Sequence, residues 1–217
     1  MSDPIKTIQV GDLTVKIYPD ENPENPREDE GNLTEMVCFH RRYNLGDKDH
    51  GFNGDKDHGF NQKDFTTWDG LQKGIIKKHN PFIILPLWML DHSGLTISTT
   101  DEFFRQMYMG MDHGRIGWVF ISRQKALEAF SAQSVTKKYL EKNLKTLQDV
   151  LQAEVKVYNQ YLRGDVYSYD IEDKNGYVIG SSNGYFGLDY CEEISTEEAQ
   201  GYIPTNNTAN MFENSSK

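Results

Sequence analysis

The residues best suited to chemistry in this chain are aspartate–histidine pairs that stand beside glycine-rich turns. Imidazole and carboxylate groups bind metal ions, and a hydrolase metal site draws such ligands from several loops that meet at one ion. His40, Asp91, His92 and Asp112 form one candidate ligand set for a divalent metal ion, whose identity stays unknown. The same Asp-X-Gly pattern is ordinary turn chemistry, and no strong ligand spacing such as HExxH occurs. The pairs are Asp49-His50, Asp57-His58, Asp91-His92 and Asp112-His113.

A basic triplet, His40, Arg41 and Arg42, offers a second kind of site. The arginine fork matches the oxygens of a phosphate or a carboxylate, so the triplet with Asp47 forms a candidate binding site. Alternatively, these side chains pair internally with the acidic loop that precedes them, and this interpretation is favoured. Without a Walker loop, a GxSxG motif or a Cys/His signature, no catalytic residue is assigned.

The octapeptide GDKDHGFN occurs twice in succession, at 46–53 and 54–61. Such a duplication survives only in an exposed, tolerant loop, because loop entropy grows slowly with length. At least one copy is therefore predicted to be dispensable. The firmer site candidates precede the repeat, from His40 to Asp47, and are expected to face Asp91 and Asp112.

The elements that must position these residues are mostly strands. One helix is predicted from Asp64, as N-cap, to 79. From Thr136 to Arg163, leucines and other large apolar residues recur every three or four positions, which predicts a long amphipathic helix. The chain is thus predicted to be α+β, a single domain over 1–202 with a mostly antiparallel sheet and that helix packed on a face, followed by a disordered tail, 203–217. The predicted strands are 7–18 as a hairpin, 35–43, 82–90 with a break, bulge or edge at Pro86, 95–99, 115–122, and the hairpin 165–172 with 177–182.

The charge of −10 is concentrated in two segments. Residues 19–35 and 175–217 carry nearly all the excess acid, and the remaining chain is close to neutral. Such a surface disfavours direct nucleic-acid binding and anionic membranes and attracts a partner with a basic surface. Two cysteines, Cys38 and Cys191, indicate buried free thiols in the cytoplasm, with a disulfide as the alternative. The predicted partner-facing acids are Glu28, Asp29, Glu30, Glu192 and Glu193.

The run NPREDEGNLTEMVCFHRRYNLGD resembles a family of small accessory proteins encoded by bacteriophages and prophages. The similarity continues through LPLWMLDHSGLTISTT (85–100), GRIGWVFIS (114–122) and AEVKVYNQYLRGDVYSY (153–169). In the family, Trp-Asp-Ser-Gly stands where this chain has Met-Asp-His-Gly at 111–114, which leaves Asp112 as a better ligand candidate than His113. The duplicated octapeptide is a second departure. The resemblance implies an accessory protein that acts in the host cytoplasm, and it implies no particular reaction.

Two functions follow from these patterns. The favoured one is a non-enzymatic binding protein that inhibits a host protein with a basic surface, such as a nucleic-acid-binding component of CRISPR or restriction defence. The alternative is a metal-dependent hydrolase that acts on nucleotides or nucleic acid through the ligand set above. A structural part of a virion is disfavoured, because nothing in the sequence indicates symmetric self-assembly.

Overall fold

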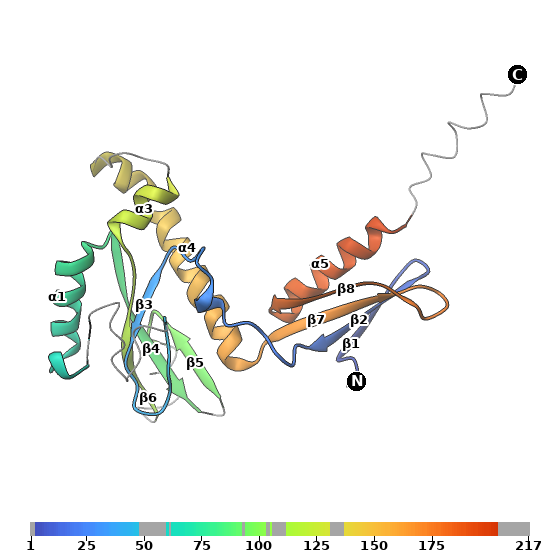
Figure 1. The fold of residues 1–217 in the computed structure, drawn as a ribbon, viewed down its shortest axis with the longest axis horizontal. Helices are drawn as coiled ribbons and strands as arrows, with labels where there is room; N and C mark the ends of the chain where they lie inside the picture. Colours follow the sequence, from blue (N-terminus) through green and yellow to red (C-terminus); the bar gives the residue numbers. More distant parts are fainter. Residues whose placement is uncertain are drawn as a thin grey trace, which may run out of the picture. The chain divides into compact units, whose positions relative to one another are not determined.

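The computed structural model describes residues 3–47, 60, 62–92, 94–102, 105, 112–130 and 137–203 (Figure 1). By its internal contacts the chain divides into two compact units. The central unit is Glu24–Arg163, and the terminal unit combines Met1–Pro23 with Gly164–Lys217. Each unit contains one four-stranded sheet in which every described strand pair is antiparallel.

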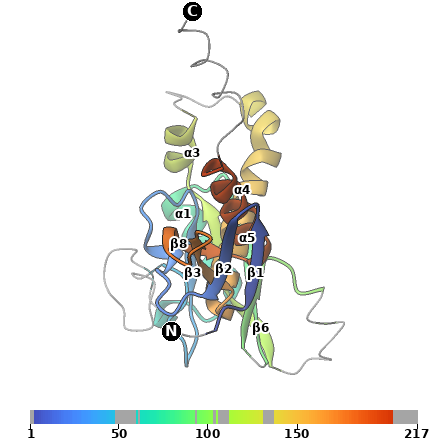
Figure 2. The same cartoon turned by 90° about the vertical axis from the view of Figure 1, so that its right-hand side faces the viewer.

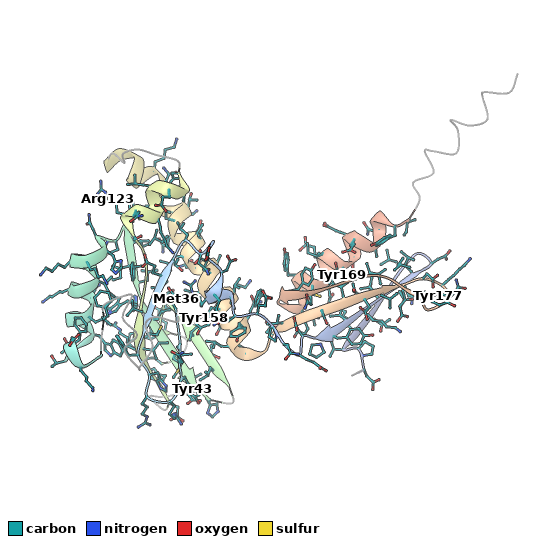
Figure 3. All side chains as sticks on the ribbon, in the orientation of Figure 1. Met36, Tyr43, Arg123, Tyr158, Tyr169 and Tyr177 are labelled. Atoms are coloured by element: carbon teal, nitrogen blue, oxygen red, sulfur yellow. The ribbon has the colours of Figure 1, made fainter. Side chains whose placement is uncertain are left out.

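The sheet of the central unit has the strand order β3-β6-β4-β5. The long helix α4 packs on one face of this sheet, where it contacts β5, β6 and β4. Its side chains buried against that face are Leu147, Leu151, Val155 and Tyr158. Met36 of β3 belongs to the same cluster as Tyr158 (Figure 3). The elements of this unit are β3 (Glu35–Cys38), α1 (Trp68–His79), β4 (Ile83–Asp91), β5 (Leu95–Ser98), β6 (His113–Ile121), α3 (Arg123–Ala129) and α4 (Lys137–Arg163), with short 3-10 turns η1 (Pro26–Glu28) and η3 (Gln62–Asp64).

The second face of this sheet carries another core under α1. Alternation along β3 and β6 sends Val37, Trp118 and Phe120 to this side, where they meet Leu71 and Ile75 of the helix. Both faces are therefore buried, which explains why β3 and most of β6 read as nearly continuous apolar runs.

A β-bulge in β6 changes the side-chain alternation near the end of the strand. Leu87 pairs with Gly117 and Trp88 pairs with Arg115, so Ile116 has no opposite residue on β4. Pro86 precedes the segment of β4 that pairs with β5, and its missing N–H therefore costs no bond on that side. The bulge places Arg115 on the same face as Trp88 and Trp118, which matters for the site described below.

The sheet of the terminal unit has the order β1-β2-β7-β8, with α5 along one face (Figures 1 and 2). Val15, Ile17, Tyr169 and Ile171 point toward the helix, and the small residues Cys191, Ser195 and Ala199 let it approach the sheet closely. The two strand pairs are hairpins that turn at Gly11 and at Asn175-Gly176. The elements are β1 (Lys6–Val10), β2 (Leu13–Pro19), β7 (Val166–Glu172), β8 (Val178–Phe186) and α5 (Leu188–Gly201).

The predicted class, α+β with antiparallel pairing and one long helix on a sheet face, is confirmed, and the strands belong to two sheets. Two local predictions need correction, and one helix was missed. Helix α1 is capped by Thr67, whose side chain accepts from the Gly70 N–H, whereas Asp64 lies in a 3-10 turn. Strand β3 ends at Cys38, well before 43. Helix α5 was not predicted from the sequence.

Several sequence predictions fall on residues outside the described part of the chain. They include Asp49-His50 and Asp57-His58 with most of the octapeptide repeat. They also include the predicted tail except for its first residue, Ile203. The predicted domain bounds stay a prediction.

Both cysteines are buried and free, and burial raises the pKa of each thiol, that of Cys191 to about 11.

Candidate functional site

Five of the seven predicted binding residues line one cavity of about 240 Å³ in the central unit. Because β4 and β6 are antiparallel and Leu90 pairs with His113, the end of β4 lies beside the start of β6. The segment that follows β3 completes the wall. The lining residues are His40, Arg41, Arg42, Met89, Asp91, Asp112, His113, Gly114, Arg115 and Ile116.

The Asp91 carboxylate has its partners within the protein. Arg42 Nη2 donates to Asp91 Oδ2 at 2.6 Å, and the Tyr43 hydroxyl donates to the same oxygen at 3.1 Å. The backbone N–H of Asp91 donates to the Asp112 carbonyl at 2.9 Å, which joins the two loops. The interpretation that Arg42 pairs with the acidic loop is therefore wrong: Arg42 neutralises Asp91.

His40 is held in a defined orientation at the cavity. Its ring stacks on Tyr43 with centroids 5.0 Å apart, and its Nδ1 accepts from the Arg42 backbone N–H at 3.3 Å. In the neutral ring the proton therefore lies on Nε2. Burial lowers the pKa of His40 below its ordinary 6.5, Arg42 and Arg41 lower it further, and Asp91 opposes them.

Replacing Arg42 with glutamine is expected to raise the pKa of His40. The change removes a cation that disfavours imidazolium, and it frees the Asp91 carboxylate, which favours imidazolium. An NMR titration of the histidine ring protons measures this, with Arg123→Gln on α3 as the matched control. The lowered pKa also makes the free energy of unfolding of the parent protein depend on pH, because the folded state favours neutral His40. This contribution to stability is present above pH 6.5 and is lost as the pH falls through the lowered pKa. An unchanged His40 pKa in Arg42→Gln would contradict this electrostatic account.

Arg115 is a charged cavity residue that the sequence interpretation missed. Its guanidinium carbon lies 4.7 Å from the centroid of Trp88 and 4.8 Å from that of Trp118. Among the described residues, no carboxylate forms an ion pair with it, and its Nε is buried without a hydrogen-bond partner. Both tryptophans stand in predicted strands, but only the bulged register of β4 and β6 reveals that they enclose the arginine.

The predicted metal ligands do not gather around one point. Within the described ranges, no group of three or more His, Cys, Asp or Glu side chains is placed to hold a metal ion. His92 is exposed and does not line the cavity, and Asp112 is exposed at its edge. The hydrolase alternative thus stays a prediction without a described ligand set.

Asp47 lies away from the cavity and has a structural role. Its Oδ1 accepts from Arg27 Nε at 2.8 Å, and its Oδ2 accepts from the Met36 N–H at 3.0 Å. Arg27 also donates to Glu154 of α4 at 3.1 Å and to the Thr34 carbonyl at 2.8 Å. Burial lowers the pKa of Arg27, but the two carboxylates outweigh it, so the pKa is raised and the side chain stays charged.

The predicted partner-facing acids belong to different units. In the central unit Glu28 ends η1 and Asp29 and Glu30 follow it, and all three are exposed. In the terminal unit Glu193 is exposed on α5, whereas Glu192 pairs with Lys6 at 2.5 Å.

Exposed apolar side chains gather at one end of the terminal unit. Tyr177 precedes β8 and is 71% exposed, and Val178, the first residue of β8, is 55% exposed. A side chain at Gly180 would come within 3.0 Å of both Glu198 and Tyr202 of α5, so this part of β8 adjoins the end of the helix. We call this set the apolar end: Tyr177, Val178, Ile179, Tyr202 and Ile203.

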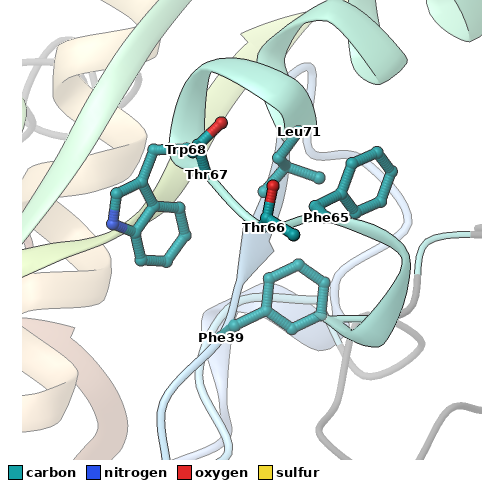
Figure 4. Close-up of a pocket in the computed structure, with 6 residues that line it drawn as sticks. All are labelled: Phe39, Phe65, Thr66, Thr67, Trp68 and Leu71. Carbon is teal, nitrogen blue, oxygen red and sulfur yellow. The ribbon is translucent and has the colours of Figure 1, made fainter.

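A second cavity, of about 220 Å³, opens at the start of α1 in the central unit (Figure 4). Phe39, Phe65, Trp68 and Leu71 give it an apolar lining, with Thr66 and Thr67 as the polar residues. The Trp118 indole N–H donates to the Trp68 carbonyl at 3.1 Å, which fixes the adjoining helix end. None of these lining residues is charged, and the Thr67 hydroxyl caps α1, so the lining offers mainly apolar contacts.

In comparisons with protein-family models, curated proteins and solved structures, nothing matched this chain. Within the described residues, none of the helices combines the length and the apolar character needed to cross a bilayer.

Proposed function

We propose that the protein is a non-enzymatic binding protein that covers a basic surface on a partner protein. The observation that carries this proposal is the composition of α5: it contains five acidic residues and no basic one. The apolar end lies beside it, and exposed apolar groups rimmed by charge are typical of protein-binding surfaces. The contact thus combines an acidic helix that selects a basic partner with apolar side chains that supply buried area.

The exposed face of α5 carries unbalanced charge at a cost to the helix. Glu193 and Glu197 are both exposed and stand one turn apart, where like charges repel. A basic partner removes this repulsion when it binds and also steers the encounter. The exposed acids Glu28, Asp29 and Glu30 of the central unit supply a second acidic surface for the same class of partner.

The resemblance to phage-encoded accessory proteins supplies the setting of the proposal. The partner is then a host protein in the host cytoplasm, and a nucleic-acid-binding component of CRISPR or restriction defence has the required basic surface. Covering that surface would inhibit the component, because nucleic acid binds through the same cations.

Reversing the charge of α5 tests the proposal. We expect Glu193→Lys/Glu197→Lys to weaken capture of the host partner about tenfold or more, because like charges now meet across the contact. Capture from host lysate is followed by affinity measurement with the purified partner at several salt concentrations. The matched control is Glu128→Lys/Asp149→Lys, which reverses two exposed acids of the central unit outside both acidic segments. A triple charge reversal at Glu28, Asp29 and Glu30 tests the second acidic surface. If the α5 double variant and this triple variant both capture the partner as the parent protein does, the proposal is wrong.

A further inference from the structure

The cavity at the adjoining ends of β4 and β6 holds an excess of hydrogen-bond donors over acceptors. Arg42 and Asp91 satisfy one another, as described above. Arg41 is exposed, and no described carboxylate forms an ion pair with it. Arg115 also lacks an ion-pair partner in the described chain. Asp112 is the remaining acid in the wall, and it is exposed to solvent at the edge.

Arg115 is the residue whose surroundings most require a ligand. A half-buried guanidinium is costly unless charged or polar partners satisfy it. Trp88 and Trp118 stabilise it through cation–π contacts over their rings, and neither side chain supplies a hydrogen-bond acceptor. The N–H donors of a guanidinium form a fork that matches two oxygens of an anion. The tryptophans therefore stabilise the charge of Arg115 without satisfying its N–H donors.

Two histidines add polar groups to the same wall. His40 Nδ1 accepts from the backbone, so its Nε2–H is the proton that a ligand would meet. His113 Nδ1 is buried with no hydrogen-bond partner among the described residues. The volume of about 240 Å³ equals about eight water molecules at about 30 Å³ each. That space accommodates the five heavy atoms of a phosphate group, and the exposed lining residues Arg41 and Asp112 show that the cavity opens to solvent, where the rest of a larger monoester would lie.

We propose that this cavity binds a phosphate-type oxyanion, with Arg115 and Arg41 as its charged ligands and His40 as a further donor. Arginine forks and histidine N–H groups are the donors that phosphate oxygens prefer. The inference is independent of the partner-binding proposal, which rests on the terminal unit and on the exposed acids. The anion is supplied either by free inorganic phosphate or by a small phosphate monoester such as a mononucleotide.

Titrations of the full chain with inorganic phosphate and with AMP, at constant ionic strength in a chloride background, test the assignment. Intrinsic fluorescence is the direct readout, because Arg115 contacts two of the three tryptophans, and calorimetry provides the affinity. We expect saturable binding of at least one of the two probes. Tighter binding of AMP identifies a monoester as the ligand, and equal or tighter binding of inorganic phosphate identifies the free ion.

Variants then assign the site. Arg41→Gln and Arg115→Gln are each expected to weaken binding about tenfold or more, since each removes a charge-assisted contact. Arg123→Gln, an exposed arginine of α3 outside the cavity, is the matched control and is expected to bind as the parent does. If Arg115→Gln fails to fold, Arg41→Gln decides, because its side chain is exposed. Absence of saturable binding by both probes, or equal affinity in Arg41→Gln and Arg123→Gln, would overturn the proposal.

Discussion

Replacing Arg27 with alanine is expected to lower the free energy of unfolding of the central unit by about 3–5 kcal/mol. The Arg27 side chain is 2% exposed, and its partners Asp47 and Glu154 are 17% and 18% exposed. Removing the guanidinium leaves two largely buried carboxylates near one another without their cation. The cost arises from that uncompensated charge and exceeds the net stabilisation that the intact network contributes.

Arg27 also joins three segments that are distant in sequence. Its two carboxylate partners lie 20 and 127 residues away. Asp47 in turn holds the Met36 N–H at the start of β3, and Glu154 accepts from the backbone N–H groups of Leu33 and Thr34. Loss of Arg27 is therefore expected to loosen the loop before β3, the loop after it and their attachment to α4.

Urea titration followed by tryptophan fluorescence measures this effect on the central unit alone. All three tryptophans, Trp68, Trp88 and Trp118, belong to that unit. Arg42→Ala is the control: it also removes an arginine–carboxylate pair, but the Arg42 side chain is 54% exposed. Exposed pairs contribute about 0–1 kcal/mol, so a similar shift in the two variants would show that burial is not the cause.

Arg27 illustrates what the sequence does not reveal about this fold. In the sequence it is the one base within an acidic, proline-rich loop, and such residues are usually solvated. Its burial depends on Asp47 and Glu154, and neither local propensity nor alternation indicates that they meet. Asp47 was predicted as a binding residue because it lies close to the basic triplet in the sequence. The structure instead places it in the network that supports β3.

The elements that were predicted well have strong local signals. The long helix α4 has its apolar stripe, and the hairpin of β7 and β8 has its Asn175-Gly176 turn. Helix α5 lacks such a signal, because its buried positions are Cys191, Ser195 and Ala199. Small residues at helical spacing do not form a recognisable apolar stripe, although they are what close packing on a sheet requires.

The part of the candidate site that was predicted also has a local signal in the sequence, whereas the part that was missed depends on strand pairing. Strand ends identified His40, Asp91 and Asp112 as neighbours, and antiparallel pairing brings their segments to one cavity. Arg115 was missed because simple alternation along β6 does not include the bulge at Ile116. The bulge is a feature of strand pairing, so it becomes visible only when both strands are placed.

Gly117 stands next to that bulge and pairs with Cys38 of β3. A Cβ built on Gly117 would lie 1.9 Å from the Val37 carbonyl oxygen and 2.9 Å from the Cys38 Cα. Both of these are backbone atoms, so no side-chain rotation relieves the overlap, and the two strands must separate. Separation would disturb the apolar clusters on both faces of the sheet at once, since Val37 and Cys38 belong to opposite ones.

Gly117→Ala is therefore expected to destabilise the central unit by about 3 kcal/mol, the upper part of the range for overpacked cores. Gly114→Ala in the same strand is the matched control, because a Cβ there meets nothing within 4 Å. Both changes reduce the entropy of the unfolded chain by the same amount, so the difference between their urea midpoints isolates the steric cost in the folded state. Tryptophan fluorescence and circular dichroism report the two transitions. Coincident midpoints would mean that β3 and β6 can move apart at no cost, which the burial of both sheet faces argues against.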